Sequence, residues 1–128
     1  MLPEELLKNV LDVVIDTPNS GKFIVAEVRI NDTKKLVVRA LKNCKYHFDI
    51  ETKLRAEVRS LGMMAWCIGG GKYRIDNDRK TLLIWSESGE FGREPDRNKT
   101  VEMLQRAFPE FTIITPDNLT ALTMGLEL

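Results

Sequence analysis

The segment HFDIETKLRAEVRSL, residues 47–61, decides the fold class, because its apolar residues are spaced as on a helix rather than a strand. Ile50, Leu54, Val58 and Leu61 follow one another at intervals of four, four and three residues, which predicts a single apolar stripe. The charged residues between them are expected to face water: Glu51, Lys53, Arg55, Glu57 and Arg59. The segment is therefore predicted to form one amphipathic helix packed on a core.

Short apolar segments on both sides of this helix predict strands, because they are rich in β-branched or aromatic residues and bounded by turn residues. The expected strands are residues 22–30, 35–40, 63–68, 72–75, 80–85 and 110–115, and a second helix is expected at residues 99–108. The turns NDTK and DND predict two hairpins. The predicted fold class is α+β, with a mixed or antiparallel sheet of about six strands flanked by two main helices.

Length and charge limit the class of protein. The 128 residues are expected to form one domain, residues 1–128. Nineteen basic residues balance nineteen acidic ones, which argues against a nucleic-acid partner. No apolar run approaches the ~18 residues of a membrane span, and the N-terminus lacks the order of a signal peptide. With only two cysteines, interpreted as reduced thiols, we expect a cytoplasmic protein that binds neither nucleic acid nor membrane.

His47 is the only histidine of the chain and stands at the expected helix start. Free backbone N–H groups at a helix N-terminus favour an anion. An imidazole side chain titrates near ~6.5, so it can act as a base or a nucleophile at cellular pH. A purely structural role, in which His47 caps or packs the helix start, is an open alternative at this point.

Two further segments could hold an anion. The glycines of residues 69–71 allow close approach of a ligand or of another strand, and their spacing fits neither a Walker A loop nor a dinucleotide fingerprint. In SESGEFG, residues 86–92, serine hydroxyls and backbone N–H groups could form an anion-binding nest. The glutamates in this loop oppose anion binding unless their side chains point away.

Other chemistries fit the spacing less well. A cysteine phosphatase loop starting at Cys67 would need its arginine one residue earlier than the chain has it. Zinc could recruit Cys44, His47, Cys67 and Asp49, but only the first two form a ligand pair of the usual spacing. No nucleophile-elbow motif supports a serine triad. A first-turn acid of the helix is the favoured interpretation of Asp49.

Three segments together resemble the protein histidine phosphatase family, also called the janus family. They are RALKNCKYHFDIETKL (residues 39–54), CIGGGKYRI (residues 67–75) and LIWSESGEFG (residues 83–92). The matching residues are Arg39, Lys42, Tyr46, His47, Asp49, Ile50, Cys67, Gly69, Gly70, Gly71, Lys72, Ser88 and Gly92. The resemblance covers about residues 12–115 and leaves the tail, residues 116–128, unassigned. In the tail, Leu119, Leu122 and Leu126 have helical spacing.

The resemblance implies a metal-independent phosphatase, without a cofactor, that acts on phosphohistidine-containing proteins. It implies His47 as general base or nucleophile, and Lys22, Ser88, Gly89 and Glu90 as the residues that hold the phosphoryl group. We expect the protein to act as a monomer. The chain departs from the family at Glu90, where a small residue is usual: a carboxylate facing the site would change affinity or substrate choice. The alternative from another class is a non-catalytic regulator that binds phosphate or phosphoproteins.

Overall fold

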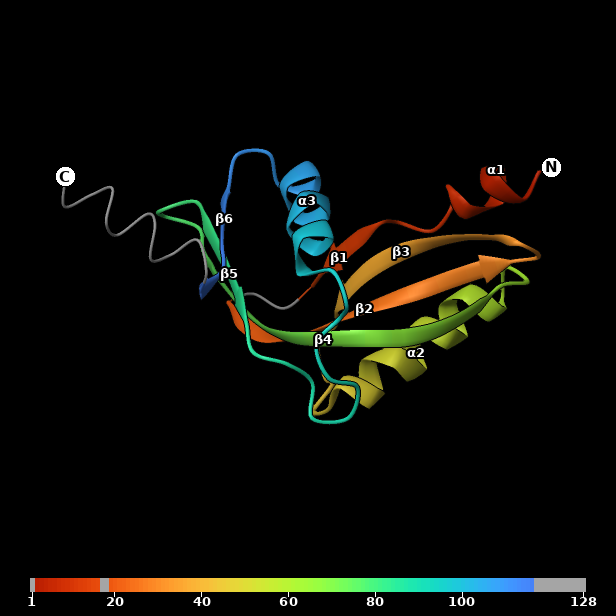
Figure 1. The fold of residues 1–128 in the computed structure, drawn as a ribbon, viewed down its shortest axis with the longest axis horizontal. Helices are drawn as coiled ribbons and strands as arrows, with labels where there is room; N and C mark the ends of the chain where they lie inside the picture. Colours follow the sequence, from red (N-terminus) through yellow and green to blue (C-terminus); the bar gives the residue numbers. More distant parts are fainter. Residues whose placement is uncertain (1, 17–18, 117–128) are drawn as a thin grey trace.

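A six-stranded mixed sheet forms the centre of the protein in the computed structural model, which describes residues 2–16 and 19–116 (Figure 1). The elements in chain order are α1 (Pro3–Leu7), β1 (Val13–Ile15), β2 (Ser20–Ile30), β3 (Thr33–Ala40), α2 (His47–Arg59), β4 (Met64–Asp76), β5 (Thr81–Trp85), α3 (Arg97–Ala107) and β6 (Thr112–Ile114). The strand order is β1-β3-β2-β4-β5-β6. The central pairs are antiparallel and the two edge strands pair in parallel, which confirms the predicted α+β class.

Both faces of the sheet are covered, because β2 is apolar on both sides. Ile24, Ala26 and Val28 pack with the buried stripe of α2, whereas Phe23 and Val25 pack with the core that α3 covers. Figure 1 shows α2 and α3 on opposite sides of the long central strands. No helix within residues 2–16 and 19–116 is long and apolar enough to cross a bilayer.

The prediction of two separate strands at residues 63–68 and 72–75 is wrong. The single strand β4 runs from Met64 to Asp76 and carries the glycines of residues 69–71 in its middle. The count of six strands still holds, because β1 adds a strand that the sequence pattern did not reveal. α1 and β1 are short, with five and three residues, and too short to show a period.

The predicted helix at residues 47–61 is confirmed except at its end. α2 ends at Arg59, and Gly62 then adopts a φ of +77°, a conformation that glycine reaches without strain. This turn buries Met63, with the Met63 N–H donating to the Val58 carbonyl over 3.0 Å. Leu61, expected in the apolar stripe, is instead 41% exposed.

Glu51 was expected to face water, and this prediction is also wrong. β4 carries a bulge opposite Val25 and Ala26, and Cys67, the partner of Ala26, lies next to it. The buried Glu51 carboxylate accepts the Cys67 N–H at 2.7 Å, and Arg55 lies 3.6 Å from the same oxygen. Glu51, on the side of α2 that faces the sheet, therefore binds the backbone of β4 at Cys67.

The second predicted helix, residues 99–108, corresponds to α3, which starts two residues earlier. Asp96 caps it by accepting the Lys99 N–H at 3.1 Å. Met103 and Leu104 are its buried apolar residues. The leucine pattern predicted for the tail lies outside the described residues.

Candidate functional site

The start of α2 places His47 over the middle of β4. Tyr46 is extended, with φ −122° and ψ 156°, and His47 is the first helical residue. Asp49 fixes this start, since its carboxylate accepts the Tyr46 N–H at 2.8 Å while its own N–H donates to the Tyr46 carbonyl. Asp49 is thus the predicted first-turn acid.

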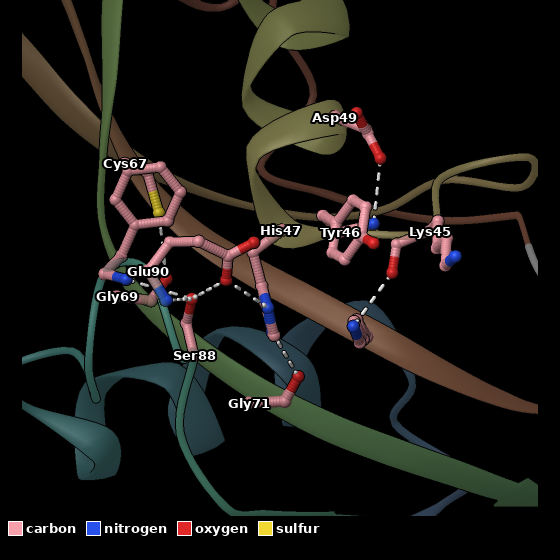
Figure 2. Close-up of polar contacts among 11 residues, drawn as sticks. Lys45, Tyr46, His47, Asp49, Cys67, Gly69, Gly71, Ser88 and Glu90 are labelled. Atoms are coloured by element: carbon pink, nitrogen blue, oxygen red, sulfur yellow. Dashed lines mark hydrogen bonds and ion pairs between the residues drawn. The ribbon is translucent and has the colours of Figure 1, made fainter.

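The His47 ring is buried, with 2% of the residue exposed. Its Nε2 lies 2.9 Å from the Gly71 carbonyl oxygen (Figure 2). A carbonyl only accepts hydrogen bonds, so Nε2 must carry the proton. In the neutral ring Nδ1 then has a free lone pair, and this buried atom has no hydrogen-bond partner among the described residues. The neighbouring Glu90 Oε2 lies 3.5 Å away.

The glycine run allows this geometry because the neighbouring backbone comes too close for side chains. A Cβ on Gly69, whose φ is +150°, would lie 2.1 Å from the backbone nitrogen of Glu94. A Cβ on Gly71 would lie 2.4 Å from the Trp85 carbonyl oxygen. Of the two roles left open for the glycines, close approach of other backbone is the one that the structure contains.

The loop from Ser88 to Gly92 faces the Nδ1 side of His47. Ser88 and Gly92 exchange backbone hydrogen bonds of 3.1 and 2.8 Å, which close the loop. The buried Ser88 Oγ accepts the N–H groups of Glu90 and Phe91 at 3.2 and 3.1 Å and donates to Glu90 Oε2 at 3.1 Å. The Ser88 hydroxyl therefore holds the loop together and directs its own proton toward the Glu90 carboxylate.

A buried ion pair holds the chain that follows this loop. Arg97 donates to Glu94 at 2.8 and 2.7 Å, and Thr100 donates to Glu94 at 2.6 Å. The same guanidinium donates to the carbonyls of Gly70 and Ser86, both at 3.1 Å. Because Arg97 bonds to Gly70 in β4 and also to Ser86 and Glu94 on either side of the loop, it fixes the loop against β4.

Glu90 carries a carboxylate among hydrogen-bond donors. Partial desolvation alone would raise its pKa, but the N–H of Glu90 itself, the Ser88 hydroxyl, the nearby His47 and the Phe48 N–H together lower the pKa below its ordinary value. A lowered carboxyl pKa indicates surroundings that stabilise negative charge. The first turn of α2 and the loop thus form an anion site.

Lys22 lies next to this site but does not reach it. Its Nζ donates to the Lys45 carbonyl at 2.8 Å and lies 5.4 Å from the centre of the Tyr46 ring. Figure 2 shows Lys45 and Tyr46 on one side of His47 and the Ser88–Glu90 pair on the other. The structure thus brings Ser88 and Glu90 to His47 and leaves Lys22 at the other edge of the helix start.

Gly89 and the cysteines complete the predicted residues. A Cβ on Gly89 would meet nothing within 4 Å, so this residue borders open space. Cys44 and Cys67 are free, and burial raises the pKa of Cys67 to about 12, so its thiol stays protonated near neutral pH. Within residues 2–16 and 19–116, no three histidine, cysteine or acidic side chains gather to hold a metal ion.

Two elements of the site were missed from the sequence. The Gly71 carbonyl determines which nitrogen of His47 carries the proton, but a backbone acceptor has no residue type that would reveal it. The Glu94–Arg97 pair holds the loop, and its only signal is the i, i+3 spacing of opposite charges at the start of a helix.

Comparison with known proteins assigns the family. The model of the Janus/Ocnus family matches residues 7–112. Sex-regulated protein janus-A from Drosophila orena and from Drosophila erecta are each 32% identical over 117 residues, covering 91% of this chain and 86% of theirs. The 14 kDa phosphohistidine phosphatase of Sus scrofa is 25% identical over 119 residues, covering 88% of this chain and 94% of that protein. The chain belongs to the Janus/Ocnus family.

Proposed function

We propose that the protein is a phosphatase that hydrolyses phosphohistidine in other proteins without a metal ion, with His47 as general base or nucleophile. The observation that carries the proposal is the orientation of the His47 ring. Its Nε2 donates to the Gly71 carbonyl, and its Nδ1 is buried, without a hydrogen-bond partner among the described residues, beside an anion site. A buried ring nitrogen that lacks a hydrogen-bond partner among these residues calls for an explanation, and a ligand that binds at Nδ1 supplies one.

The donors around Nδ1 fit the demands of phosphoryl transfer. The transferred group passes through a loose transition state with charge on its outer oxygens, so the enzyme mainly positions the group and neutralises charge. The Ser88 hydroxyl and the N–H groups of Phe48 and Glu90 stabilise a carboxylate at this place. The same donors would bind the oxygens of a phosphoryl group.

Two pathways use the same nitrogen. As a base, Nδ1 takes a proton from a water molecule whose oxygen bonds to phosphorus while the P–N bond of the substrate breaks. As a nucleophile, Nδ1 itself bonds to phosphorus while that P–N bond breaks, and water then displaces the phosphoryl group from His47. In both cases the substrate imidazole leaves with the electron pair of the broken bond and takes up a proton from solvent.

Lys22 supports the proposal as a cation at the edge of the site. Its Nζ is bound to a single carbonyl oxygen, and the long side chain can turn toward a bound phosphoryl group. Gly89 contributes backbone only, and its open surroundings leave room for the substrate. The similarity to the pig phosphohistidine phosphatase supports the reaction, whereas the names of the janus-A relatives state none.

A second candidate is a regulator that binds phosphate or phosphoproteins without turnover. The Glu90 carboxylate favours it, because it lies 3.5 Å from Nδ1, where a water molecule or a phosphorus atom would have to approach. In that case the same donors would bind the phosphoryl group of a partner protein, and the P–N bond would not be hydrolysed.

One experiment separates the two candidates. A peptide carrying phosphohistidine is incubated with the protein, and both released phosphate and bound peptide are measured against a sample without protein. The proposed function predicts release of phosphate over many turnovers in the presence of a chelator. Stoichiometric binding of the phosphorylated peptide without release would establish the regulator, and neither binding nor release would refute both.

A further inference from the structure

The anion site beside His47 is filled by the chain itself. The carboxylate of Glu90 accepts the Ser88 hydroxyl at 3.1 Å and lies 3.5 Å from His47 Nδ1 (Figure 2). Its own N–H and the Phe48 N–H, in the first turn of α2, also stabilise it. The groups available for a phosphoryl oxygen are therefore already engaged with a side-chain anion.

A carboxylate resembles part of a phosphoryl group. Both present oxygens with negative charge that accept short hydrogen bonds from N–H and O–H donors. The two groups cannot occupy the same donors together, since like charges so close repel strongly. Binding of a phosphoryl group thus requires the Glu90 side chain to leave.

The side chain has a free way out. The Glu90 carboxyl side chain is 36% exposed, and Gly89 beside it borders open space. Ser88 is buried in a loop closed by its backbone hydrogen bonds with Gly92, and Phe48 lies in the first turn of α2. The Ser88 hydroxyl and the Phe48 N–H are therefore expected to stay in place when the carboxylate swings away. The site then has a filled state and an open state that differ in one side chain.

We propose that Glu90 is a specificity-determining residue that acts as an internal competitor for the phosphoryl group. This proposal rests on the proposed function. In it, the Glu90 carboxylate lowers the affinity of the site for free phosphate. Only the open fraction of the protein binds phosphate, so the measured Kd rises in inverse proportion to that fraction. A substrate protein gains further contacts outside the pocket and displaces Glu90, whereas the product phosphate, lacking them, is released.

The neighbouring Glu87 provides a matched control. It belongs to the same chain segment, is exposed, and forms no hydrogen bond or ion pair with the residues that the structure describes. Changing it to glutamine removes the same charge three residues earlier in the chain. An effect of Glu90 that arises only from general charge repulsion would appear equally in Glu87→Gln.

The experiment measures binding of inorganic phosphate to untagged protein by the 15N chemical shifts of the imidazole. Because His47 is the only histidine, a single ring gives the signal. We expect Glu90→Ala to lower the Kd of phosphate about tenfold or more relative to the wild type, if a tenth or less of the wild-type protein is open. Glu90→Gln is expected to lower it less, and Glu87→Gln by under about twofold, the small effect of one exposed charge at the salt of the assay.

Acetate supplies a second readout. In Glu90→Ala the vacated donors should accept acetate and shift the His47 signals, whereas wild-type protein should not respond at the same concentration. Equal phosphate affinity in Glu90→Ala and the wild type, with both folded by circular dichroism, would overturn the proposal. So would an equal gain in Glu87→Gln.

These outcomes are independent of turnover. Tighter phosphate binding by Glu90→Ala, in a protein that releases no phosphate from phosphohistidine, would support the internal competitor and refute the phosphatase. Turnover by the wild type, with equal phosphate affinity in Glu90→Ala and the wild type, would support the phosphatase and refute the internal competitor.

Discussion

Replacing Ser88 by alanine tests whether the loop hydroxyl contacts the phosphoryl group. The hydroxyl is buried, accepts two backbone N–H groups and donates to a carboxylate at 3.1 Å. If it donates to a charged phosphoryl oxygen in the transition state, its loss costs about 1.5–3 kcal/mol. At ~1.36 kcal/mol for each factor of ten, kcat/KM should fall about 10- to 150-fold where the Glu90 carboxylate does not compete for the same hydroxyl.

The fold should survive this change. The N–H groups of Glu90 and Phe91 lose their acceptor, but neither residue is buried, so water can replace the hydroxyl. We expect the free energy of unfolding to fall by about 1 kcal/mol. Ser20→Ala is the matched control, because the Ser20 side chain is exposed and makes no hydrogen bond with described residues.

The assay is steady-state hydrolysis of a phosphohistidine peptide, with urea unfolding as the stability control. Because Ser88 also binds the Glu90 carboxylate, its loss weakens the competitor together with the substrate. The full reduction should therefore appear in a Glu90→Ala background, where the double-mutant cycle isolates the contact to the phosphoryl group. Unchanged kcat/KM for Ser88→Ala in both backgrounds would remove the hydroxyl from the site.

The remaining predictions concern charge, thiols and stability. Lys22→Ala should lower kcat/KM about tenfold or more through loss of a charge-assisted hydrogen bond, while the exposed Lys8→Ala should not, and equal kinetics would exclude Lys22 from catalysis. Replacing both Cys44 and Cys67 by serine should leave kcat/KM near wild type, since the raised pKa of Cys67, about 12, keeps its thiol protonated at assay pH, and loss of activity in a folded variant would indicate a thiol mechanism. The raised pKa of Cys67 also predicts how the free energy of unfolding depends on pH. Because the folded protein holds the thiol proton more tightly than the unfolded chain, this free energy is unaffected below the ordinary thiol pKa and declines as pH rises from about 9 toward 12. Glu51→Ala should lower the free energy of unfolding by about 1–3 kcal/mol in urea titrations, because the Cys67 N–H at the bulge loses its acceptor, and a change under about 0.5 kcal/mol would contradict this role.

The sequence predicts the parts of the fold that have a clear period. The stripe of α2 was found because Ile50, Leu54 and Val58 repeat at helical intervals. Glycine within a strand resembles a break, so the sequence predicts two strands where β4 is one. The close approach of the Glu94 backbone and the Trp85 carbonyl explains why glycine is needed at residues 69 and 71. The spacing also predicts that the helix reaches Leu61, whereas α2 ends at Arg59 and a turn follows with Gly62 at a φ of +77°.

The site was predicted in its residues more than in its geometry. The resemblance pointed to His47, Ser88 and Glu90, which do lie together. The proton position on the ring depends on which carbonyl of β4 faces the first turn of α2, and a contact to a backbone carbonyl has no signature in residue types. The orientation of the Glu90 carboxylate depends on loop donors that belong to the backbone.

The most direct measurement of the central claim is kcat/KM of His47→Ala on a phosphohistidine peptide, with circular dichroism as the folding control. Removal of general acid–base or nucleophilic chemistry predicts a fall of about two orders of magnitude or more, in a variant that remains folded. Added imidazole, which can enter the space of the deleted ring, should restore part of the rate. A folded His47→Ala variant that keeps more than about a tenth of the wild-type kcat/KM, outside the range for lost acid–base catalysis, would contradict the account.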